Sequence, residues 1–161
     1  MKGLEPDERI ANLLVGYYAL YQAVHVLVNA RGLHILMTGG VLDFPVAPPP
    51  GGWSPDVVNI CVAIGFAALF GAAVALLFAY GYFTGARWRI WAGTVALTIT
   101  MYAHFVYAYW PIASGAWAGP NAGPYLFVHV ATLPILALVA LVARWALCGR
   151  LVEVAQPSSA T

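Results

Sequence analysis

Four long apolar stretches restrict the folds that this chain can adopt. A helix needs about 20 apolar residues to cross a bilayer core that is roughly 30 Å thick, and stretches of this kind run approximately over residues 10–30, 57–83, 90–110 and 125–146. None of them alternates with period two, as membrane β-strands do. In lipid, only helices and closed barrels satisfy their own backbone hydrogen bonds. We therefore predict an all-α integral membrane protein with a four-helix transmembrane bundle.

Composition supports lipid as the solvent of these helices. Of the 161 residues, 62% are hydrophobic and only 8% are charged, whereas soluble domains contain about 25% charged residues. A small globule leaves much of its surface exposed and cannot hide this excess of apolar side chains. The net charge is +1, and no basic patch with interleaved aromatic residues indicates a nucleic-acid partner.

The segments between the apolar stretches predict the domain organisation. Residues 38–56 and 111–124 are rich in Pro and Gly, which break helices, and residues 84–89 form a short basic turn. The first stretch exceeds the roughly 7–15 apolar residues of a signal peptide, so we expect a retained helix, which can extend to Met37. We interpret residues 1–9 as a polar N-terminal segment, residues 10–150 as one transmembrane domain and residues 151–161 as a disordered tail.

Basic residues predict the orientation of the bundle. With up-down connections, six of the seven basic residues fall at one end of the helices: Lys2, Arg9, Arg87, Arg89, Arg144 and Arg150. Arg31 falls at the other end. Cytoplasmic loops carry the excess of Lys and Arg in membrane proteins. We therefore predict that both termini are cytoplasmic, in a multi-pass protein of a bacterial cytoplasmic membrane.

Polar residues gather at one depth in the outer half of the predicted bundle. His25, His104 and His129 come from three different stretches, and at a rise of 1.5 Å per residue their depths agree within about 3 Å. Polar side chains in membrane helices usually turn toward the bundle interior. On the first helix, successive polar residues are separated by 4, 3 and 4 positions, which places them on one face: Tyr18, Gln22, His25 and Asn29. We predict an outward-opening ligand pocket formed by Tyr18, Gln22, His25, Asn29, Asn59, His104, Tyr107 and His129.

These residues are compatible with more than one function. The first hypothesis is a non-enzymatic accessory subunit or a binder of a lipid-like ligand. The alternative is a redox component, because two histidines can hold haem b and three can hold a metal; the metal ligands are then His25, His104 and His129. A third interpretation is interhelical hydrogen bonding without a ligand. The expected partners are membrane lipids and either another membrane protein or a second copy of the chain.

Several chemistries are disfavoured by the residues themselves. The two cysteines, Cys61 and Cys148, form no CxxC motif and fall near opposite membrane faces, so neither thiol–disulfide exchange nor a disulfide is expected. No acidic residue lies within a predicted span, which argues against a di-iron carboxylate site.

Pro134 removes one backbone hydrogen bond from the fourth helix and frees a carbonyl near residue 130.

Overall fold

The protein is a bundle of four long helices. The computed structural model describes residues 6–42, 53–114 and 122–155, and within these ranges it contains α1 (Pro6–Met37), α2 (Pro55–Phe83), α3 (Arg89–Ser114) and α4 (Ala122–Ala155), with no strand. All four helices are long and apolar enough to cross a membrane. The prediction of an all-α, multi-pass membrane protein with four candidate spans is confirmed at this level.

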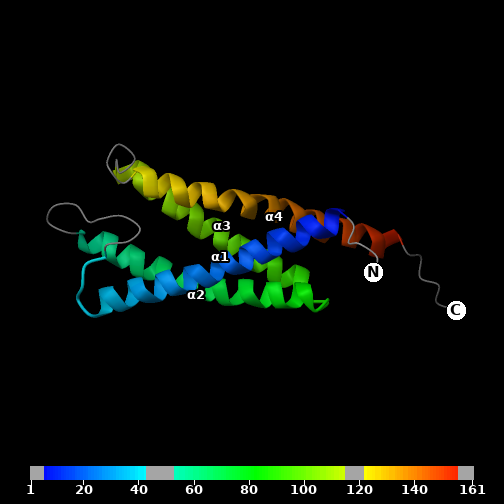
Figure 1. The fold of residues 1–161 in the computed structure, drawn as a ribbon, viewed down its shortest axis with the longest axis horizontal. Helices are drawn as coiled ribbons and strands as arrows, with labels where there is room; N and C mark the ends of the chain where they lie inside the picture. Colours follow the sequence, from blue (N-terminus) through cyan, green and yellow to red (C-terminus); the bar gives the residue numbers. More distant parts are fainter. Residues whose placement is uncertain (1–5, 43–52, 115–121, 156–161) are drawn as a thin grey trace.

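Successive helices run in opposite directions (Figure 1). The start of α1, the turn between α2 and α3 and the end of α4 therefore lie at one end of the bundle. Each helix packs against its two neighbours in the circular order α1, α2, α3, α4, so α1 lies diagonally across from α3. The contacts of α2 with α1 and α3 are much more extensive than those of α4 with its neighbours.

The helix ends differ in part from those expected. The helix α1 does reach Met37, and Gly39 follows it with φ of 75°, a left-handed conformation that glycine adopts readily at helix ends. The helix α4 continues to Ala155, so residues 151–155 of the predicted disordered tail are helical. Residues 55–56, 111–114 and 122–124, which were expected in the two Pro/Gly-rich loops, are also helical. Residues 156–161 of the tail and residues 43–52 and 115–121 of the loops lie outside the described residues.

An apolar core fills the bundle from its middle toward the end that holds the α2–α3 turn. Its buried members come from all four helices: Val15, Tyr18, Ala75, Phe78, Ala79, Ala96, Leu97, Ile135, Leu138 and Val142. Large apolar side chains such as Leu13, Leu27, Phe70 and Phe127 are more than half exposed around the outside. In water this surface would be costly, whereas a bilayer solvates it.

Glycines allow α2 and α3 to pack closely. A Cβ atom added at Gly71 of α2 would lie 2.7 Å from Cγ2 of Ile99, and one added at Gly93 of α3 would lie 2.8 Å from the ring of Phe78. Real Cβ atoms do not approach neighbours this closely. Small residues at helix interfaces allow close backbone approach in membranes, and here they join α2 and α3 tightly.

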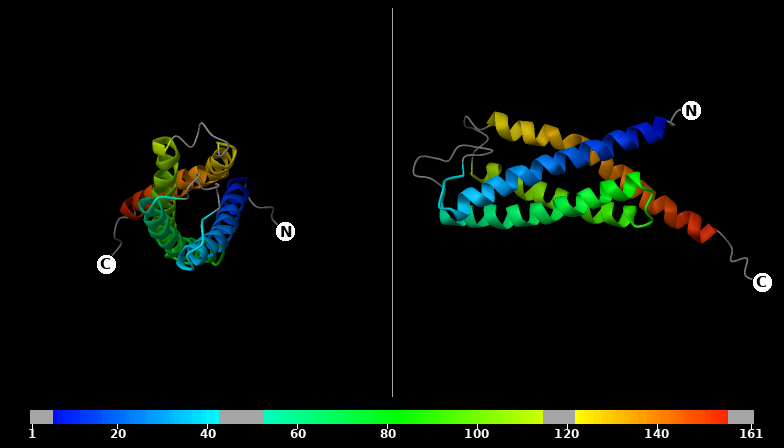
Figure 2. Two further views of the ribbon diagram at one scale, coloured as in Figure 1. Left: turned by 90° about the vertical axis from the view of Figure 1, so that its left-hand side faces the viewer. Right: turned by 60° about the horizontal axis from the view of Figure 1, so that its bottom comes forward.

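The helix α4 is held to the others by a few side-chain contacts. The Tyr17 hydroxyl of α1 donates a hydrogen bond of 2.5 Å to the carbonyl of Ala131. The neighbouring carbonyl, that of Val130, lacks its usual helical partner, because Pro134 has no N–H. Farther along, Trp145 stacks on Tyr82 with ring centroids 5.8 Å apart. The helices α1 and α4 cross and then separate toward the end where α1 finishes (Figure 2).

Candidate functional site

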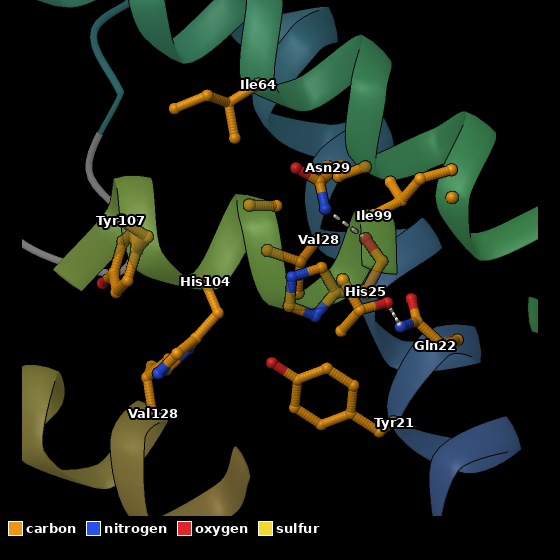
Figure 3. A pocket seen from close by; sticks show the side chains of 14 residues that line it. Tyr21, Gln22, His25, Val28, Asn29, Ile64, Ile99, His104, Tyr107 and Val128 are labelled. Atoms are coloured by element: carbon orange, nitrogen blue, oxygen red, sulfur yellow. Dashed lines mark hydrogen bonds between the residues drawn. The ribbon is translucent and has the colours of Figure 1, made fainter. Parts of the chain in front are cut away.

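A cavity of about 170 Å³ lies between the helices, in the half of the bundle where α1 ends and α2 begins (Figure 3). It lies where α1 and α4 have separated, beyond the contact between Tyr17 and Ala131. All four helices contribute to its wall, which consists of Tyr21, Gln22, His25, Val28, Asn29, Ile64, Ala68, Gly71, Ile99, Thr100, Ala103, His104, Tyr107 and Val128.

One wall of the cavity is a polar stripe on α1. Tyr21, His25 and the pair Val28 and Asn29 are separated by three or four residues, about one helical turn each, and therefore share a face. The rings of Tyr21 and His25 stack with centroids 4.8 Å apart, and the Asn29 amide donates to the His25 carbonyl at 2.8 Å. No side chain in the described part of the protein hydrogen-bonds the Tyr21 hydroxyl or the His25 ring nitrogens. Both groups can therefore bind a molecule in the cavity.

The opposite wall contains a pair of histidines from α3 and α4. Nε2 of His104 lies 3.1 Å from Nδ1 of His129 and 3.4 Å from Oγ1 of Thr132. The Thr132 hydroxyl donates its single hydrogen to the His129 carbonyl at 2.7 Å, so its oxygen can only accept from His104. The tautomer of neutral His104 that carries its proton on Nε2 makes both of these contacts hydrogen bonds. Its Nδ1 is then an acceptor, with no hydrogen-bond partner among the described residues.

A buried polar cluster closes the cavity toward the apolar core. The Thr100 hydroxyl oxygen lies 2.7 Å from the Tyr18 hydroxyl and accepts a hydrogen bond of 2.9 Å from the Gln22 amide. Tyr18 is 0% exposed and Gln22 is 3% exposed, so lipid and water cannot replace these partners. Because α1 and α3 are diagonal in the bundle, this cluster spans its centre.

The structure brings together most of the residues proposed from the sequence. Gln22, His25, Asn29, His104 and Tyr107 line the cavity. Two others lie just outside its wall: Tyr18 is in the buried cluster below, and His129 contacts His104 from α4.

Asn59 does not lie with the others. It is exposed and does not line the cavity. The cavity face of α2 contains Ile64, Ala68 and Gly71, and Asn59 precedes Ile64 by five residues, a rotation of roughly 140° around the helix. Depth along the helix alone therefore did not predict whether Asn59 belongs to the site, because its rotation around the helix axis directs it elsewhere.

Two polar residues of the site were not included in the predicted pocket. Tyr21 lines the cavity and stacks on His25, and Thr100 joins the cavity wall to Tyr18 and Gln22. Their spacing carried the information: Tyr21 lies four residues before His25, and Thr100 lies four residues before His104. The apolar wall residues, such as Ile64 and Val128, could not be distinguished from lipid-facing neighbours of the same type.

The arrangement of histidines bears on the haem and metal hypothesis. Within the described residues, no three His, Cys, Asp or Glu side chains are placed to hold a metal ion. Ligand–metal bonds of about 2 Å would put two nitrogens on opposite sides of a metal about 4 Å apart. His104 and His129 contact each other directly at 3.1 Å, so this pair leaves no room for a haem iron between its rings.

Comparison of the chain with known protein families, with curated proteins and with solved structures gave no match.

Proposed function

We propose that this protein binds a small amphipathic molecule from the membrane, with a ring-sized part of the ligand inside the cavity. The main support for this proposal is the cavity itself, in which apolar walls surround a few convergent polar groups, as in most small-molecule sites. An engineered protein cavity of about 150 Å³ holds benzene, so a volume of about 170 Å³ is suitable for one ring. The role is that of a binding or accessory protein.

The shape of the bundle supports entry from the lipid phase. Among the described residues, α4 contributes only Val128 to the cavity wall, and α1 and α4 diverge on this side of their crossing (Figure 2). A ligand tail can therefore extend between α1 and α4 into the acyl chains while the head remains among the polar groups.

The proposed orientation places the cavity in the outer half of a bacterial cytoplasmic membrane. Its support is the distribution of charge: Arg9, Arg87, Arg89 and Arg144 belong to the end of the bundle that holds the α2–α3 turn, and Arg31 belongs to the other end. By the positive-inside rule, the arginine-rich end is cytoplasmic.

Native mass spectrometry of the protein purified in a mild detergent tests the binding function. Wild-type protein is expected to carry a small-molecule adduct. Ala68→Phe should remove it, because Ala68 lines the cavity and a phenyl ring would fill the space. Ala67→Phe adds the same ring at the neighbouring exposed position and should retain the adduct.

Two results would contradict the proposed function. One is a wild-type protein without any adduct. The other is an adduct that Ala68→Phe and Ala67→Phe retain equally, which would place the molecule on the outer surface. A Soret band in the absorption spectrum, lost in His104→Ala, would instead support the haem hypothesis.

A further inference from the structure

We infer that the ligand is an uncharged, hydroxylated ring with an alkyl chain, of the phenol or quinol class, and that its hydroxyl donates a hydrogen bond to Nδ1 of His104. The inference rests on the proposed binding function and specifies the chemistry of the same cavity.

The residues around the cavity favour a neutral ligand. Among the described residues, none of the side chains that line it is Asp, Glu, Lys or Arg. A buried charge is very costly unless an opposite charge or a metal compensates it. A phosphate or an ammonium head group would lie in this space without such a partner, whereas an uncharged ring would not require one.

The histidine pair sets the polarity of the hydrogen bond. In the proposed complex, Nε2 of His104 carries the proton and donates toward α4, where the Thr132 oxygen can only accept because its hydrogen is directed to the His129 carbonyl. The lone pair on Nδ1 is what His104 can offer to a ligand. A hydroxyl group can donate to it, but an ether or a hydrocarbon cannot.

The wall formed by α1 suits the rest of such a ring. Tyr21 and His25 form a stacked pair, and a further aromatic ring can pack edge-to-face or offset against them. A phenol hydroxyl and a neutral imidazole can each donate and accept a hydrogen bond. They can therefore bind a second ligand oxygen, whether it is a carbonyl or a hydroxyl. Figure 3 shows Tyr21 and His25 on α1 and His104 on α3, on different sides of the cavity.

Binding of matched alkyl-ring probes tests this chemistry. The purified full-length protein in detergent is titrated with 4-decylphenol, with its methyl ether 4-decylanisole and with decylbenzene, and affinities are measured by calorimetry. The three probes share the ring and the tail, and only the first has a donor. We expect 4-decylphenol to bind about tenfold more tightly than the ether, as one additional hydrogen bond to the protein predicts.

Histidine variants assign the preference to one side chain. His104→Leu should abolish the preference for 4-decylphenol, so that the phenol and its ether bind this variant with equal affinity. His104→Gln keeps an acceptor and should restore part of the difference. His34→Leu is the matched control, because His34 is exposed on α1 and does not line the cavity, and it should leave all three affinities unchanged.

The comparison of probes on wild-type protein does not depend on any variant. Equal affinities for 4-decylphenol and 4-decylanisole would overturn the inference, and so would a preference for the phenol that persists in a folded His104→Leu variant. Either result leaves the proposed function standing if Ala68→Phe still removes the native adduct and Ala67→Phe does not. Loss of that difference would remove both proposals.

Discussion

At the scale of single residues, Thr100 holds the centre of the bundle together. Its hydroxyl oxygen is shared by Tyr18 and Gln22, and both of these side chains are buried. Hydrogen bonds between membrane helices contribute only about 0.6 kcal/mol on average. Removing a shared partner is more destabilising, because a buried polar group without a hydrogen-bond partner lowers the free energy of unfolding by about 1–3 kcal/mol.

Thr100→Val is therefore expected to destabilise the protein, since it keeps the shape of the side chain and removes the hydroxyl. We expect the free energy of unfolding in detergent to fall by about 1–3 kcal/mol. The control is Thr98→Val on the same helix, where the side chain is exposed and the hydroxyl donates to the Thr94 carbonyl of its own turn. Equal effects of the two substitutions would show that the Thr100 cluster does not stabilise the fold.

The polar residues of the site were only partly predictable from the sequence. Periodicity placed Gln22, His25 and Asn29 on one face of α1, and counting residues from the helix ends placed His104 and His129 at a similar depth. Neither argument gives the rotation of one helix about its axis relative to the next. That rotation decides that His129 pairs with His104 while His25 stacks on Tyr21, and that Asn59 faces outward.

At the scale of helices, packing is uneven around the bundle. The helices α2 and α3 are in close contact through Gly71 and Gly93, whereas α4 is joined to α1 and α3 by fewer contacts. The apolar stretches predicted the existence of all four helices, because length and hydropathy are local properties. The ends were less accurate: residues 111–114 and 151–155 are helical, although they were expected in a loop and in a disordered tail.

Gly93→Ala should weaken the junction of α2 and α3. The added methyl group would meet the ring of Phe78, which is fully buried and has little room to move. Overpacking of this kind typically costs about 1–3 kcal/mol, so thermal unfolding in detergent should occur at a lower temperature.

Gly16→Ala provides the comparison for that substitution. No atom lies within 4 Å of a Cβ built at Gly16, and alanine has the higher helix propensity. The melting temperature of Gly16→Ala should therefore be unchanged or higher. A similar loss of stability in both variants would point to a general cost of alanine in these helices and not to the contact with Phe78.

At the scale of the whole molecule, the two ends of the bundle differ in charge. The end with the start of α1 and the α2–α3 turn contains Arg9, Arg87 and Arg89. The fold class followed from apolar length alone, because only helices or closed barrels are stable in lipid. The orientation of the bundle is defined only relative to the two sides of a membrane, so it is tested in the cell.

Cysteine labelling in intact cells measures this orientation. In a background with Cys61→Ala and Cys148→Ala, single cysteines are introduced as Ser54→Cys or Thr84→Cys, both at exposed positions at opposite ends of α2. A membrane-impermeant maleimide should label Ser54→Cys only, and Thr84→Cys should react only after the cells are opened. The reverse pattern would mean that the termini are outside and that the cavity belongs to the inner leaflet.

The contact between His104 and α4 separates the shape of the cavity from its chemical preference. Among the described residues, all that line the cavity except Val128 belong to α1, α2 and α3. His129 and Thr132 are not among the described residues that line it, yet both contact Nε2 of His104. Under the proposed function, a substitution at Thr132 is therefore expected to change the affinity for hydroxylated ligands while the volume of the cavity stays the same. Residues that do not touch the ligand would then contribute to the selectivity of the proposed site.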